Sequence, residues 1–200
     1  GAGGTLEGRY SLPQRVSTLR ALHLTSAGEM AEGNGVVLFS PEPVLTNTQM
    51  KLSKISAEAI KSILPESAKA WTVRGTADAD LELEGPWNAI SMKGVARTNG
   101  AELESDACSV QQLNLTAPFT WANSTLRAEN VRIRGKTLAV KNRAVQFAAE
   151  ELQLDGGLES QPGKPLRTNG KLRLLRGRYA TPDGSKMGEN FNLAGHLDMT

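Results

Sequence analysis

The chain has 200 residues, of which 39% are hydrophobic and 22% charged. This is enough for one domain with a buried core, and too polar for a bundle of membrane-spanning helices. A net charge of +2 and only 4% aromatic residues argue against a nucleic-acid partner, which needs a clustered basic face or stacking rings. Cys108 is the only cysteine, so neither an internal disulfide nor a cysteine-built zinc site can form.

The first element that stands out is a short helix, predicted over residues 55–65. Ile55 and Ile60 have the spacing of a hydrophobic staple and belong to one apolar stripe. Ser56 suits the N-cap, and Pro65 follows the last apolar residue, where helices stop. We expect the stripe of this helix to cover an end of the apolar face of a sheet.

The clearest strand runs from residue 71 to residue 84. Apolar and polar residues alternate over its whole length, which places all apolar side chains on one face. Gly85 and Pro86 then signal a turn, and residues 87–97 are predicted to return as the second strand of an antiparallel hairpin. The apolar positions of the first strand are Trp71, Val73, Gly75, Ala77, Ala79, Leu81 and Leu83.

The same alternation continues to the end of the chain. Residues 113–121 form a strand whose Pro118 belongs at an edge or a bulge, and a change of parity near Asn130 predicts a β-bulge. Gly156 and Gly157 are interpreted as a break that opens a loop over residues 156–165. Since this loop is too short to separate two units, residues 1–200 are expected to form a single β-rich domain.

Three segments resemble AsmA-like proteins, a group that includes the TamB-related periplasmic proteins of Gram-negative bacteria. They are the helix end Ile63-Leu64-Pro65, the alternating strands of residues 73–87, and the Asn-Gly-Ala-Glu-Leu segment of residues 99–103. The likeness covers roughly residues 35–155.

The resemblance implies a mainly β fold: a long twisted antiparallel sheet, shaped as a U-shaped groove or an open β-sandwich, with one short helix. It also implies a periplasmic, non-enzymatic section of a protein whose inner-membrane anchor lies outside these residues. Such a protein carries phospholipid acyl chains along an apolar groove toward the outer membrane, in outer-membrane biogenesis. Its further partners are inner- and outer-membrane proteins, and no cofactor or metal is expected.

The residues expected to contact lipid are the apolar face itself, because water on such a face costs roughly 25 cal/mol per Å². An ordinary dry core is the alternative for each of them. The corresponding alternative function is a closed β-sandwich or solenoid that acts as an adhesion or assembly module and binds a protein or glycan. The predicted lipid-binding residues are Trp71, Val73, Ala79, Leu81, Leu83, Leu113, Leu115, Phe119, Trp121, Phe191, Leu193 and Leu197.

Catalytic and metal-binding patterns are weak. Asp78 and Asp80 form an Asp-x-Asp pair, but on the polar face of a strand, where solvated charges are far commoner than metal ligands. His196 is expected to face solvent, whereas His23 could face either way, and neither has a spaced catalytic partner. Cys108 is interpreted as a small, semi-buried residue without a nearby base.

One basic cluster occurs near the end of the chain, where basic residues alternate with leucines. A solvated strand face is the first interpretation, and contact with lipid head groups or an acidic partner is the second. The cluster consists of Lys164, Arg167, Lys171, Arg173, Arg176 and Arg178.

Overall fold

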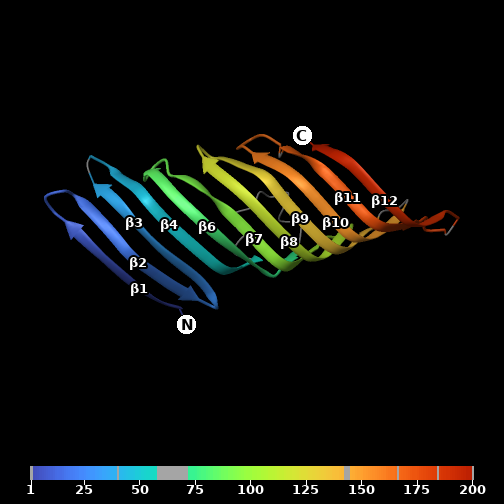
Figure 1. Cartoon of the computed structure of the whole chain (residues 1–200), viewed down its shortest axis with the longest axis horizontal. Helices are drawn as coiled ribbons and strands as arrows, with labels where there is room; N and C mark the ends of the chain where they lie inside the picture. Colours follow the sequence, from blue (N-terminus) through green and yellow to red (C-terminus); the bar gives the residue numbers. More distant parts are fainter. Residues whose placement is uncertain are drawn as a thin grey trace.

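The computed structural model describes residues 2–39, 41–57, 72–141, 145–165, 167–183 and 185–199. These residues form one antiparallel sheet of twelve strands (Figure 1). The strands are β1 (Ala2–Ser11), β2 (Val16–Ser26), β3 (Glu29–Phe39), β4 (Pro43–Ser56), β5 (Thr72–Arg74), β6 (Thr76–Pro86), β7 (Ser91–Glu104), β8 (Cys108–Ala122), β9 (Thr125–Lys141), β10 (Gln146–Ser160), β11 (Arg167–Ala180) and β12 (Met187–Met199).

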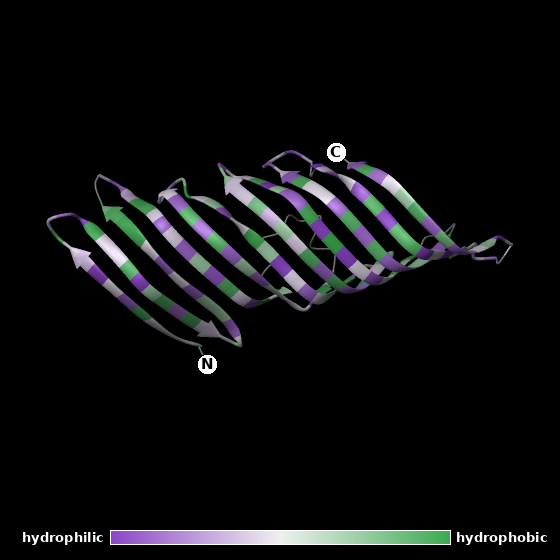
Figure 2. Ribbon diagram, viewed as in Figure 1, coloured by the Kyte–Doolittle hydropathy of each residue, from purple (hydrophilic) through white to green (hydrophobic). Residues whose placement is uncertain are grey.

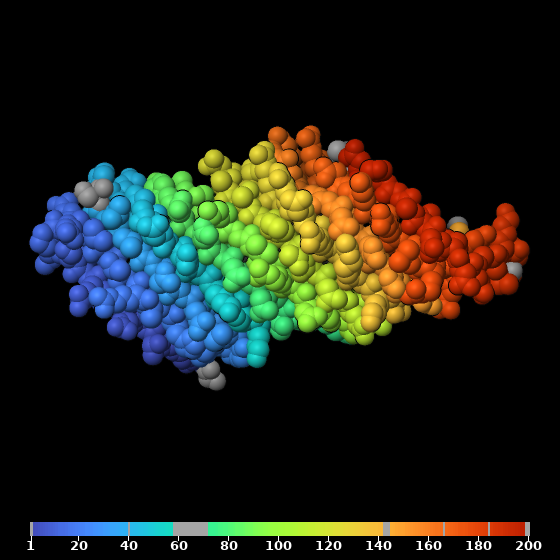
Figure 3. Space-filling view, in the orientation of Figure 1, coloured from blue at the N-terminus to red at the C-terminus, as the bar shows by residue number. Residues whose placement is uncertain are grey.

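Each strand pairs with its neighbour in the chain, except that β4 pairs with β6, and the short β5 pairs with β7. The path begins at β1 and ends at β12, and these two strands do not pair, so the sheet is open. Figure 3 shows the same order in space, because the colours follow the sequence along the long axis of the molecule. The prediction of a mainly β, twisted antiparallel sheet is therefore confirmed.

The sheet has two chemically different faces, since cross-strand partners share a face and successive residues alternate. The apolar face carries Ala77, Ala79, Leu81 and Leu83 of β6 and every residue in register with them. The polar face carries Asp78, Asp80, Glu82 and Glu84 and their partners. Figure 2 shows this alternation as bands of opposite hydropathy along the strands.

Single-residue bulges keep the apolar residues on one face where the period of two fails. The bulge residues adopt left-handed φ angles of 47° to 56°, which bend the strand and reverse the parity that follows. A bulge at Asn130 was predicted from the sequence and is confirmed by the register shifts on both sides of β9. The other bulge residues are Asn47, Lys54, Gln112, Thr137, Arg176 and Asn190.

At some bulges the backbone N–H has no carbonyl partner on the neighbouring strand. A polar side chain of that strand then accepts a hydrogen bond from the N–H group. The Lys54 N–H donates to Asp78 Oδ1 at 2.9 Å, and the Arg176 N–H donates to Asn192 Oδ1 at 3.1 Å. Gly100 in β7 does the same with Asn114 Oδ1 at 3.1 Å. These bonds stabilise the bends, because an unpaired backbone N–H costs free energy when it is shielded from water.

The tightest packing lies in the C-terminal half, beside the bulges of β8, β9 and β11. Val110, Leu138, Ala149 and Leu174 are buried there, each from a different strand of the apolar face. They form the core cluster because bent strands bring side chains of one face together. Elsewhere most of the apolar face is only half-buried.

The helix predicted over residues 55–65 is wrong at its start. Ile55 and Ser56 are the last residues of β4 and pair with Ala77 and Thr76 of β6. The bulge at Lys54 places Ile55 on the apolar face of the sheet. The position of Ile55 is therefore explained by the bulge and not by a hydrophobic staple. Residues 58–65 lie outside the described part of the chain. Among the described residues, no helix has the length and apolarity needed to cross a membrane.

The predicted break at Gly156 and Gly157 is also wrong, since β10 continues to Ser160. A Cβ atom at Gly156 would overlap the carbonyl oxygen of Asn169 in β11, so glycine is required there for close strand approach rather than for a turn. The hairpin after β6 is confirmed, although its second strand starts at Ser91 instead of residue 87. Its first strand, predicted as continuous over residues 71–84, is divided at Gly75 into β5 and β6. Pro118 lies at the register shift between β8 and β9, as the bulge alternative predicted.

Candidate functional site

Eleven of the twelve predicted lipid-binding residues lie on the apolar face. Trp71 is the twelfth and falls outside the described residues. The register brings distant segments together: Leu83 and Trp121 both lie beside Met92, and Leu115 lies between Thr98 and Ile133. The eleven are Val73, Ala79, Leu81, Leu83, Leu113, Leu115, Phe119, Trp121, Phe191, Leu193 and Leu197.

The apolar face is continuous across the whole sheet. Glu29, at the end of β3, is the one charged residue at its paired positions in the described strands, and its carboxylate accepts the Ser56 N–H at 2.9 Å. Hydrogen bonds from the Ser56 side chain, and then from this backbone N–H, lower the pKa of Glu29. One cross-strand row runs through Leu6, Leu22, Gly33, Met50, Leu81, Gly94, Phe119, Ala128, Leu158 and Thr168.

Large hydrophobic side chains on this face remain in contact with water. Leu6 is 72% exposed and Leu193 is 48% exposed, and these residues lie on β1 and β12, the two open edges. All described strands belong to the one sheet, so no second sheet of described residues covers the face. The exposed large residues fall into two groups, on β1 to β3 and on β11 and β12, and exposed apolar patches are typical of interaction sites. The exposed large residues of the apolar face are Leu6, Tyr10, Leu24, Phe39, Tyr179 and Leu193.

An aromatic cluster lies on the C-terminal part of this face. The ring centroid of Phe191 lies 5.8 Å from that of Phe147 and 5.9 Å from that of Tyr179. The Phe191 ring covers Gly177, where a Cβ atom would come within 2.7 Å of it. Phe191 is therefore partly a packing residue, which is the alternative that the sequence left open for every member of the predicted set.

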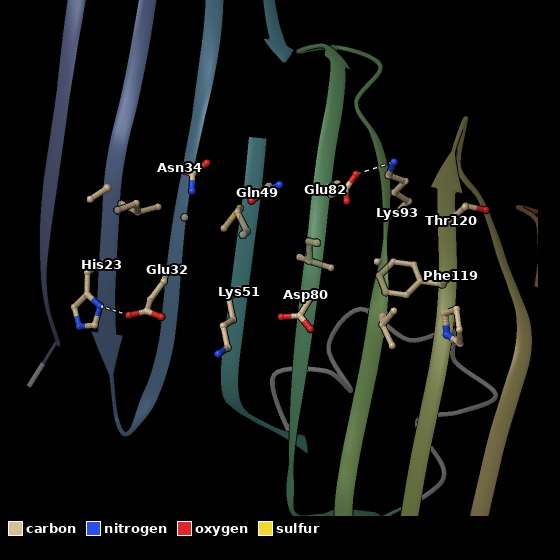
Figure 4. A pocket seen from close by; sticks show the side chains of 18 of the residues that line it. His23, Glu32, Asn34, Gln49, Lys51, Asp80, Glu82, Lys93, Phe119 and Thr120 are labelled. Atoms are coloured by element: carbon tan, nitrogen blue, oxygen red, sulfur yellow. Dashed lines mark hydrogen bonds and ion pairs between the residues drawn. The ribbon is translucent and has the colours of Figure 1, made fainter. Parts of the chain in front are cut away.

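A shallow cavity of about 1010 Å³ crosses the middle of the molecule from β2 to β9 (Figure 4). Six of its lining residues, such as Met50 and Leu81, belong to the apolar row, but most come from the positions on either side, with charged side chains such as Glu32, Lys51 and Asp80. The size fits a small-molecule or lipid ligand. The cavity therefore follows this row across the sheet, but it is not an apolar pocket.

The polar face of the central strands is held by cross-strand ion pairs. Lys93 Nζ lies 2.7 Å from Glu82 Oε2, and this hydrogen bond raises the pKa of Lys93 (Figure 4). Arg97 donates to Asp80 Oδ2 at 2.5 Å. Asp78 already accepts the Lys54 N–H. Both carboxylates of the Asp-x-Asp pair are therefore engaged, and the described residues contain no cluster of three or more metal-ligand side chains.

The two histidines lie on the polar face. His23 Nδ1 is 3.2 Å from Glu32 Oε1, and both side chains remain nearly half exposed, so the pair is an ordinary surface contact. His196 is exposed and lies opposite Lys171, on the side that its alternation predicted. Cys108 lies on the apolar face opposite Val140, where burial raises the pKa of its thiol and keeps it protonated.

Sequence reasoning missed the N-terminal third of the apolar face. Leu22 and Leu24, and also Met50 and Leu52, alternate in the way that marks a strand. Glycine and serine occupy several apolar-face positions of β1 to β3, and the bulges at Asn47 and Lys54 break the period in β4. The short Leu-x-Leu and Met-x-Leu patterns were the available signal.

No family model, no curated protein and no solved structure matches this chain.

Proposed function

We propose that the apolar face binds phospholipid acyl chains, and that the chain is a non-enzymatic section of a lipid-carrying groove in the cell envelope. The observation that carries the proposal is a partly exposed apolar surface that extends over every strand of the main path of an open sheet, with Glu29 as the one charged residue at its paired positions in the described strands. Exposed hydrocarbon costs about 25 cal/mol per Å², so a ligand of the same chemistry stabilises the folded state.

The dimensions of the face support acyl chains over a compact ligand. The main path of the sheet contains eleven strands, which at about 4.8 Å per strand gives a face roughly 48 Å wide. Half of a bilayer core of about 30 Å measures about 15 Å, so the face exceeds the length of one acyl chain about threefold. Leucine, alanine and glycine predominate, which offers contact area without one dominant anchor.

The proposed transport has a direction across the cell envelope. In a Gram-negative cell the groove would lie in the periplasm and carry lipid from the inner membrane toward the outer membrane, which is what the resemblance to AsmA-like proteins implied. A surface whose one charged residue, Glu29, lies at the start of β3 lets an acyl chain shift along the rest of it, since no ion pair with the protein has to break.

The test is native mass spectrometry, with lipid extraction, of the chain purified without detergent from a Gram-negative host. We expect stoichiometric phospholipid. A mass without lipid, together with an extract free of phospholipid, refutes the proposal and favours an adhesion or assembly module whose apolar face is covered by a protein.

A further inference from the structure

The polar face of β9, β10 and β11 has an arrangement of charge that the lipid groove does not explain. In register, two columns of basic residues on β9 and β11 flank one column of acidic residues on β10. The columns contain seven cations and three carboxylates. They consist of Arg127, Arg132, Arg134 and Lys136 on β9, Glu151, Asp155 and Glu159 on β10, and Arg167, Lys171 and Arg173 on β11.

Each of the three carboxylates already forms an ion pair with an arginine. Arg134 pairs with Asp155 at 2.8 Å, and Arg127 pairs with Glu159 at 3.1 Å. Gln161 and then Arg127 hold the pKa of Glu159 below its usual range. Glu151 is bound by the bulge residue Arg176.

Five cations of these columns remain. Arg167 lies opposite Glu159 and interacts with it electrostatically, and the other four are exposed and form no ion pair with any described residue: Arg132, Lys136, Lys171 and Arg173. The surplus is local. On the central strands of the same face, Lys93 and Arg97 are neutralised by Glu82 and Asp80.

These cations lie close together on one face of the sheet. Neighbouring positions on one strand and face lie about 7 Å apart, and β9 and β11 lie about 10 Å apart on either side of β10. These spacings are within the Debye length of about 10 Å, so the charges act on a partner together. Leu175 is the one large apolar residue at the paired polar-face positions of the described β9 to β11, so the surface lacks the anchors of a protein interface.

We infer that this basic face of β9 and β11 docks onto the anionic head groups of a phospholipid bilayer. An array of exposed cations on two strands, with no aromatic ring and with Leu175 as its one large apolar residue at the paired polar-face positions of the described β9 to β11, matches a plane of mobile negative charges. A single-stranded nucleic acid would need stacking side chains that this face does not provide. The inference rests on the strand register and on charge, and it does not require that the opposite face binds acyl chains.

The test is co-sedimentation of the whole chain with vesicles of phosphatidylcholine alone, or of phosphatidylcholine with about 30% phosphatidylglycerol, at low and high salt. We expect binding to the anionic vesicles only, weakened by salt. The variant Arg132→Gln/Lys171→Gln/Arg173→Gln should bind about a hundredfold more weakly, because each cation near the surface is worth about a factor of five.

A matched control removes the same formal charge elsewhere. Arg9→Gln/Arg15→Gln/Lys186→Gln changes three exposed cations on β1 and in two turns, and it should retain most of the binding. Equal loss in both variants, unchanged binding of the first variant, or equal binding to neutral vesicles would each overturn the inference. Phospholipid that co-purifies with the first variant reports on the groove separately, so the two proposals can fail independently.

Discussion

Replacing Leu81 by asparagine tests the apolar face at the centre of the sheet. Leu81 is half-buried and lies in the row between Met50 and Gly94. Less than about a third of Leu81 remains in water, and covering that part contributes about 0.5 kcal/mol, from about 1.5–3 kcal/mol for a whole side chain. A side-chain amide pressed against hydrocarbon without a partner costs about 2 kcal/mol more. Leu81→Asn should therefore weaken lipid binding by about sixtyfold.

The matched control is Leu175→Asn. Leu175 is also a half-buried leucine, but it lies on the polar face of β11, opposite Glu151. Lipid affinity is measured by titration of a fluorescent phospholipid into delipidated protein, and circular dichroism and thermal melting establish that both variants are folded. If both variants lose lipid equally, or if the Leu81 variant binds as tightly as the parent protein, then the apolar face does not hold the acyl chain.

Three further predictions follow from local geometry. Gly156→Ala should lower the free energy of unfolding by about 1–3 kcal/mol in denaturant titrations, because its Cβ would overlap β11. Gly195 has open space, so Gly195→Ala should change the free energy of unfolding by less than about 0.5 kcal/mol. Equal effects of the two substitutions contradict the packing argument. Iodoacetamide should modify Cys108 more slowly in folded than in urea-unfolded protein at pH 8, because burial raises the pKa of the thiol; equal rates refute this. Thr181 and the turn that follows lower the pKa of Asp183 to about 2, so this carboxylate stabilises the turn above about pH 4, and the stabilisation is lost as the pH falls toward 2. An NMR titration should show that Thr181→Ala raises this pKa, and an unchanged value would exclude the threonine as its cause.

Predictions that depended on residues within one strand agree with the structure, whereas those that failed concern segments whose structure depends on contacts between strands. Val73, Ala79 and Leu83 were assigned to one face from alternation alone, and the structure agrees. Ile55 was assigned to a helix because a bulge at Lys54 shifts the apolar positions of β4 into a spacing that resembles a helical stripe. A bulge stabilised by a side chain on another strand, such as Asp78, is invisible within a short window of sequence.

By itself, the sequence determined that the chain is made of strands, that each strand has one apolar and one polar side, and that Asn130 interrupts this period. These properties are local, because the side-chain period of a strand is two. The tertiary structure alone decided that β4 pairs with β6, that β1 and β12 stay apart, and that the cations of β9 and β11 flank the acids of β10. Those relations depend on register between distant segments, and a pattern within one segment does not specify its partner.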